Sequence, residues 1–105
     1  MKRYIAALAW ALATPALGAG FDIQVDNFYV DGGIATVVMK VTNNTGLPAE
    51  SVFIDCAFLD KDERAIEIGK ALIPAIAAGG YAYDKAAAVT GDRVQFAACD
   101  VVRSR

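Results

Sequence analysis

The feature that most constrains this fold is an alternation of apolar and polar side chains, which recurs every two residues from residue 21 onward. Two series show it best: Ala35, Val37, Met39 and Val41, and then Val52, Ile54, Cys56 and Phe58. Successive side chains of a β-strand point to opposite faces, so an apolar residue at every second position predicts a half-buried strand. Since the same region has no long apolar pattern with the period of a helix, we expect it to be all-β.

Turn signals divide this region into short strands. They predict turns or loops at residues 31–33, 43–48, 60–64, 75–80 and 91–92. The strands expected between them are 21–30 with a break at residue 27, then 34–42, 51–60, 65–72, a strand from residue 81, and 93–102. Pro74 is expected to end the fourth strand, because proline cannot donate a hydrogen bond to a neighbouring strand.

Six or seven short strands of this kind predict a small antiparallel β-sandwich. Strand 51–60 is apolar on both faces, which favours a central position in its sheet. Two alanine-rich stretches, 71–78 and 85–88, leave a short helical turn open.

The first 19 residues have the layout of a secretory signal peptide. Lys2 and Arg3 precede an uncharged apolar run over residues 4–13, and small residues follow at Gly18 and Ala19. The apolar run is about half of the roughly 20 residues that a membrane-spanning helix needs, although an uncleaved anchor remains the alternative. We therefore expect a signal peptide at 1–19 and a β-sandwich domain at 20–105. The domain would be periplasmic or secreted, with no stable membrane anchor after cleavage.

Two cysteines, Cys56 and Cys99, lie in the part of the chain expected to be exported. An even number of cysteines in an oxidising compartment predicts one disulfide bond. The last strand has a conflict of parity, since Val94 and Phe96 share one face whereas Cys99 falls on the other. Either the cysteine points away from the face of Phe96, or a β-bulge near residues 97–98 resets the strand; we expect the bulge.

Composition excludes several classes of function. The basic residues after the first 19 are scattered singly, so no basic patch for nucleic acid is expected. The chain contains no histidine, which removes the Ser-His-Asp arrangement, the commonest general base near neutral pH and the commonest zinc ligand. We therefore expect a protein that is not an enzyme and holds no cofactor.

Two groups of side chains are candidates for binding. Asp60, Asp62 and Glu63 lie in one turn, where three carboxylates could hold Ca²⁺, or could instead be a solvated hairpin tip. The tyrosines Tyr29, Tyr81 and Tyr83 are candidate binding anchors, although tyrosine is also common in ordinary strands.

Residues 39–102 resemble the FxLYD domain family of small exported bacterial proteins. The stretches that carry the resemblance are VTNNTGLPAESV, then CAFLD with its charged turn, then the connector IPAIAAGG and a tyrosine-containing strand. The resemblance implies an immunoglobulin-like β-sandwich with no catalytic residues. The sandwich pattern, the lack of a catalytic set in the sequence and the expected disulfide favour a non-enzymatic module that binds another envelope protein. The alternative is a small-ligand or calcium-binding periplasmic protein.

Overall fold

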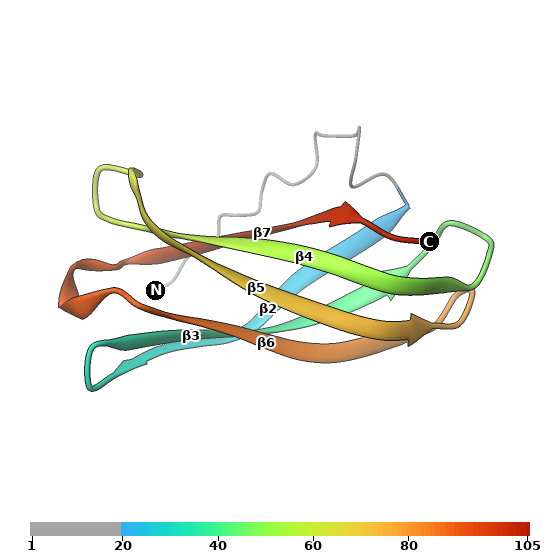
Figure 1. The fold of residues 1–105 in the computed structure, drawn as a ribbon, viewed down its shortest axis with the longest axis horizontal. Coiled ribbons are helices and arrows are strands. Elements are labelled where there is room, and N and C mark those ends of the chain that lie inside the picture. The colour runs from blue at the N-terminus through green and yellow to red at the C-terminus, as the bar shows by residue number, and fades with distance from the viewer. Residues whose placement is uncertain (1–19) are drawn as a thin grey trace.

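The computed structural model describes residues 20–105. The expected signal peptide, residues 1–19, lies outside the described residues. Within residues 20–105, six strands follow one another, with one short 3-10 helix between the last two (Figure 1). The elements are β2 (Phe21–Asp31), β3 (Ile34–Asn43), β4 (Ala49–Leu59), β5 (Ala65–Ile76), β6 (Tyr81–Val89), η2 (Gly91–Arg93) and β7 (Phe96–Arg103).

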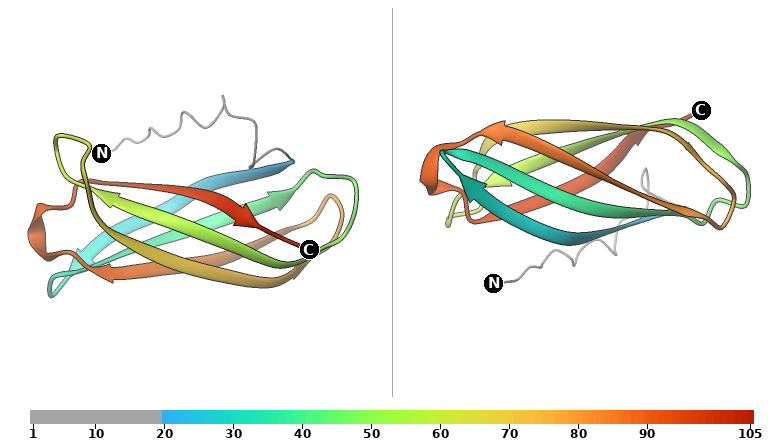
Figure 2. Two further views of the ribbon diagram at one scale, coloured as in Figure 1. Left: turned by 45° about the horizontal axis from the view of Figure 1, so that its top comes forward. Right: turned by 90° about the horizontal axis from the view of Figure 1, so that it is seen from below.

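The strands form two antiparallel sheets of three strands each, in the orders β2-β3-β6 and β5-β4-β7. The two sheets stack face to face, and the β5-β4-β7 sheet lies toward the viewer in Figure 1. The turned views of Figure 2 show the same two layers and the crossings of the chain between them. The all-β prediction is confirmed, and β4 is the central strand of its sheet. Among residues 20–105, no helix has the length and apolarity that a membrane crossing requires.

The core lies between the sheets and is built from the two alternating series. The series in β3 and the series in β4 are both almost completely buried: Ala35, Val37, Met39, Val41, Val52, Ile54, Cys56 and Phe58. Burying an aliphatic or aromatic side chain of this size contributes about 1.5–3 kcal/mol. A shift of one residue in either strand would bring polar side chains into the core, so the alternation also fixes the register.

The sequence predicted that Pro74 ends the fourth strand, and this is wrong. In the structure β5 continues through Pro74 to Ile76. The register pairs Val52 with Ile73 and Glu50 with Ala75, and it skips the residues between them. At this skipped step Ser51 has a positive φ of 51°. Proline is tolerated there because β5 is an edge strand.

The expected bulge near residues 97–98 is also wrong. β4 and β7 pair without interruption from Leu59↔Phe96 to Ile54↔Val101, and the irregularity lies beyond Ile54. Cys99 therefore points away from the face of Phe96, and Val94 reaches the core from the connection that precedes β7. In β2, the break expected at residue 27 is a shift of register between Val25 and Asn27 within one continuous strand.

The two alanine-rich stretches form strand rather than helical turns. Residues 85–88 lie within β6, and residues 71–76 lie within β5. Alanine is a good helix former in isolation. Here each stretch pairs with a strand, β3 or β4, that packs one face into the core, so the tertiary contacts override the helix propensity of alanine.

Asn43 anchors two loops at one end of the sandwich. Its side chain is fully buried. The amide nitrogen Nδ2 donates to the carbonyl oxygens of Leu47, at 2.7 Å, and Ile76, at 3.0 Å. The amide oxygen Oδ1 accepts from the backbone nitrogen and the hydroxyl of Thr45. One side chain thus joins the β3–β4 loop to the end of β5.

Gly69 marks the place where β5 passes close to β6 and the two sheets meet along one side. A Cβ atom at this position would lie 2.9 Å from Cε2 of Phe58 and 3.1 Å from the carbonyl oxygen of Ala87. Both neighbours are held, one by the core and the other by the backbone of β6. A side chain therefore cannot be added here without moving the two strands apart.

We expect Gly69→Ala to lower the free energy of unfolding by about 1–3 kcal/mol, the usual cost of overpacking. Urea unfolding of the variant and the parent measures this, with the exposed Glu67→Ala on the same strand as the control. A change equal to that of the control would show that β5 and β6 are not held at this distance.

Candidate functional site

Cys56 and Cys99 form a disulfide bond, with the two sulfurs 2.08 Å apart. They lie directly opposite one another on the neighbouring strands β4 and β7, and their Cα atoms are 4.0 Å apart. The bond therefore lies within one sheet. Cys56 is fully buried and Cys99 is partly buried against the core. Because both cysteines are shielded in this way, the bond is a structural disulfide rather than a pair of accessible, reactive thiols.

The acidic turn is organised by its own hydrogen bonds. Oδ1 of Asp60 accepts from the backbone nitrogens of Asp62, at 2.8 Å, and Arg64, at 3.0 Å. The guanidinium of Arg64 pairs with the carboxylate of Asp62 at 3.1 Å. Within residues 20–105, no three His, Cys, Asp or Glu side chains gather in a way that could hold a metal ion. Asp60, Asp62 and Glu63 therefore do not form the calcium site that the sequence suggested.

The hydrogen bond from the backbone nitrogen of Arg64 lowers the pKa of Asp60 below its ordinary value of 3.8. The backbone hydrogen bond from Asp62 and the charges of Arg64 and Arg93 act in the same direction. A carboxyl with a lowered pKa in the folded state stabilises the fold above its unfolded pKa. That stabilisation is lost as the pH falls through the folded pKa.

We therefore expect Asp60→Asn to lower the melting temperature at pH 7, and expect this difference to shrink below about pH 4. Asparagine keeps an oxygen that can accept both backbone hydrogen bonds, so the variant removes mainly the charge. Melting curves between pH 2 and pH 7 test this, and a difference independent of pH would contradict it.

The structure brings together two of the three candidate tyrosines. Tyr81 and Tyr83 lie on the outer side of β6 with ring centroids 5.9 Å apart, edge to face. The ammonium nitrogen of Lys40 lies 4.4 Å from the centre of the Tyr81 ring. Tyr29 is on β2, at the other edge of the same sheet and toward its opposite end. The three tyrosines do not form one site.

A surface that the sequence did not single out lies on the outer side of the β5-β4-β7 sheet, which we call the outer face. One apolar area contains Phe53, Leu72 and Val102, and the guanidinium of Arg103 lies 4.4 Å from the Phe53 ring. Leu72 is 49% exposed and Val102 is 44% exposed. Such exposure of neighbouring large apolar side chains is typical of interaction surfaces.

A second apolar area lies further along the same strands. Ala57 of β4 pairs with Ile68 on one side and with Ala98 on the other. Ile68 is 47% exposed. This area and the first one share a single sheet face because their residues are an even number of positions apart on each strand.

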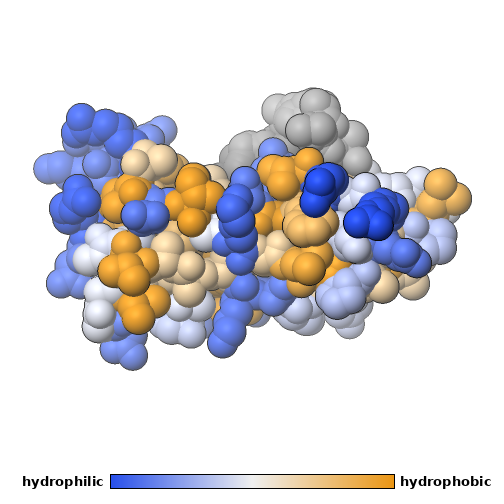
Figure 3. Space-filling view, in the orientation of Figure 1, coloured by the Kyte–Doolittle hydropathy of each residue, from blue (hydrophilic) through white to orange (hydrophobic). Residues whose placement is uncertain are grey.

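A charged row separates the two apolar areas. In register across the sheet it contains Lys70 of β5, Asp55 of β4 and Asp100 of β7. Nζ of Lys70 lies 3.0 Å from Oδ1 of Asp55. Figure 3 shows this face, with a hydrophilic band between two apolar areas. The outer face is thus apolar at both ends and charged across its middle.

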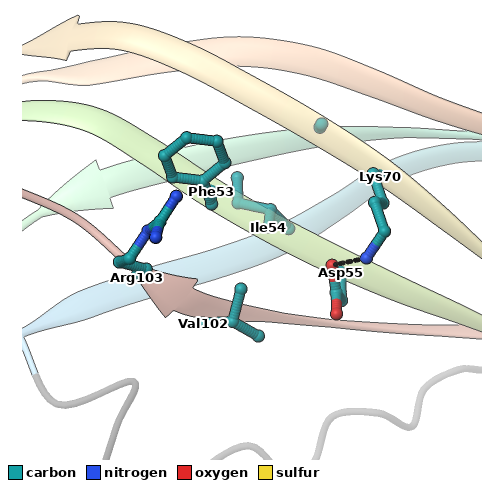
Figure 4. Close-up of a pocket in the computed structure, with 7 residues that line it drawn as sticks. Phe53, Ile54, Asp55, Lys70, Val102 and Arg103 are labelled. Atoms are coloured by element: carbon teal, nitrogen blue, oxygen red, sulfur yellow. Dashed lines mark hydrogen bonds and ion pairs between the residues drawn. The ribbon is translucent and has the colours of Figure 1, made fainter.

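A shallow hollow of about 340 Å³ lies at the junction of the first apolar area and the charged row. Figure 4 shows the side chains of Phe53, Asp55, Lys70, Val102 and Arg103 around it. It is open to solvent rather than enclosed, unlike the clefts that bury most of a small ligand. Its form suits the side chains of a second macromolecule better than a sequestered substrate.

The sequence carried part of the signal for this face. Phe53, Ala57 and Leu59 alternate with the core series of β4, which placed them together on the other side of that strand. The pairing with Ile68 and Leu72 of β5 depends on the register between the strands, which a single sequence does not contain. No protein-family model, no curated protein and no solved structure matches this chain.

Proposed function

We propose that this chain is an exported, non-enzymatic β-sandwich module that binds another protein chain in the bacterial envelope through its outer face. The observation that carries the proposal is the pair of apolar areas with Ile68, Leu72 and Val102 each more than two-fifths exposed. Leaving so much aliphatic surface in water is unfavourable by about 25 cal/mol for each Å², and a partner would recover that free energy.

The strand order supports an immunoglobulin-like fold of the FxLYD kind. The first, second and fifth strands share one sheet, and the third, fourth and sixth share the other. This fits strands A, B and E, and strands C, C′ and F, of an immunoglobulin domain. The disulfide differs, because immunoglobulin domains link their two sheets whereas Cys56 and Cys99 join neighbours in one sheet.

Export is supported by two independent features. The first 19 residues carry the charge, apolar run and small residues of a signal peptide. The disulfide is compatible with an oxidising compartment, such as the periplasm or the medium, and such bonds are rare in the cytosol.

Photo-cross-linking in the producing cells tests the interaction. Benzoylphenylalanine replaces Leu72 on the outer face, and in a matched control it replaces Val89, which is 74% exposed on the other sheet. We expect an adduct of defined mass from position 72 and none from position 89. No adduct from either position, or equal adducts from both, would overturn the proposal.

A further inference from the structure

We propose that the partner of the outer face is a second copy of this chain, arranged about a two-fold axis that runs parallel to β4. The inference rests on the proposed function, since it takes the outer face as the interaction surface and names what covers it. Its basis is the order of charges in the row Lys70, Asp55 and Asp100.

The charged row is not balanced within one molecule. Asp55 and Asp100 are directly opposite one another on β4 and β7, an arrangement in which like charges destabilise a sheet. Lys70 neutralises Asp55, at 3.0 Å, from the other side. Asp100 is exposed and takes part in none of the ion pairs seen among residues 20–105. The row therefore presents a cation at the β5 edge and an unneutralised carboxylate at the β7 edge.

A second copy supplies the missing cation. A two-fold axis along β4 places the β5 edge of each molecule over the β7 edge of the other. Lys70 of each copy then faces Asp100 of the other, so the interface gains two opposite-charge contacts, against one like-charge contact of Asp55 with Asp55 at the axis. The same rotation places each apolar area on its equivalent, so Phe53 meets Phe53, and Leu72 lies over Val102 and Arg103 of the other copy.

The charges also select this arrangement against its main competitor. A two-fold axis across the strands would place Lys70 over Lys70 and Asp100 over Asp100, and would bring each apolar area onto the other one. Like-charge juxtaposition across an interface costs several kcal/mol, so this arrangement is disfavoured. The charged row thus determines the orientation in which two identical outer faces pair.

The size of the face predicts a weak and reversible dimer. Three strands spaced about 4.8 Å apart, over about eight residues of each, give a face of roughly 15 Å by 25 Å. This is about half of the roughly 800 Å² that each partner buries in a stable complex of standard size. We therefore expect dissociation in the micromolar range or above, where ion pairs at the interface have a measurable effect.

Sedimentation equilibrium of the protein purified from the producing cells, at roughly 10–500 µM, tests the inference. We expect the parent to dimerise, and Lys70→Glu and Asp100→Lys each to weaken the dimer at least about tenfold, because each creates two like-charge contacts. Lys85→Glu and Asp22→Lys make the same charge changes on the outer side of the other sheet and serve as matched controls. Circular dichroism establishes that all four variants are folded.

The decisive arm mixes the two outer-face variants. In a mixed dimer both contacts join opposite charges again, so Lys70→Glu and Asp100→Lys should associate with each other although neither associates with itself. A parent that stays monomeric, or variants that behave as the controls do, would overturn the inference. If position 72 then cross-links in cells to a protein of another mass, the proposed function survives; if it cross-links to nothing, both fail.

Discussion

Reduction of the Cys56–Cys99 bond is expected to lower the free energy of unfolding by about 4 kcal/mol. The bond closes a loop of 43 residues, and in the chain-entropy treatment a cross-link of that span restricts the unfolded state by about this amount. Small domains have a total stability of only about 5–10 kcal/mol. The reduced protein should therefore be close to unfolding at physiological temperature.

Urea unfolding with and without a reducing agent measures this effect. The double variant Cys56→Ala with Cys99→Ala is the control, because it should match the reduced protein and show no response to reductant. A decrease of less than about 1 kcal/mol on reduction would contradict the expectation. It would show that the pairing of β4 with β7 keeps the domain stable without the disulfide bond.

The second large effect is expected for Asn43→Asp, which should lower the free energy of unfolding at pH 7 by about 3 kcal/mol or more. The buried amide nitrogen donates to the carbonyl oxygens of Leu47 and Ile76, and a longer contact of 3.4 Å reaches that of Ala77. A carboxylate has no hydrogen to donate, so the substitution loses both bonds. It also buries a negative charge against the oxygens that the amide had satisfied.

The pH dependence of Asn43→Asp distinguishes this cause from a simple loss of packing. Burial raises the pKa of the introduced carboxyl above its unfolded value, so the variant binds more protons when folded and the destabilisation is relieved as the pH falls. Asn44→Asp, at the exposed neighbouring position, is the control. Urea unfolding at pH 3 and pH 7 gives the comparison, and an equal loss at both values would contradict this account.

The core and the strand order along the chain were predictable because they depend on local pattern. The alternation in 34–42 and 51–60 placed eight side chains in the core, and the structure buries all of them. Glycine and charged turns placed the connections at 31–33 and 60–64, because these sequences adopt turn conformations whatever surrounds them.

What could not be predicted depends on contacts between strands distant in the sequence. Pro74 stays in a strand for two reasons: β5 is an edge strand, and the pairing with β4 skips Pro74 and Ser51. Both depend on β4, which precedes Pro74 by more than a dozen residues in the sequence. The sequence predicts Asn43 only as one residue of a turn, since nothing nearby in the sequence shows that Ile76 lies within hydrogen-bond distance of it. The outer face likewise arises only when Ile68 and Leu72 are set beside β4.

The intact mass of the native protein tests at once whether the chain is exported and whether Cys56 and Cys99 are bonded. Without reductant, we expect a chain in the periplasm or the medium that begins near Ala19 or Gly20 and lacks two thiol hydrogens. A cytosolic chain that begins at Met1 and carries two free thiols would contradict this expectation.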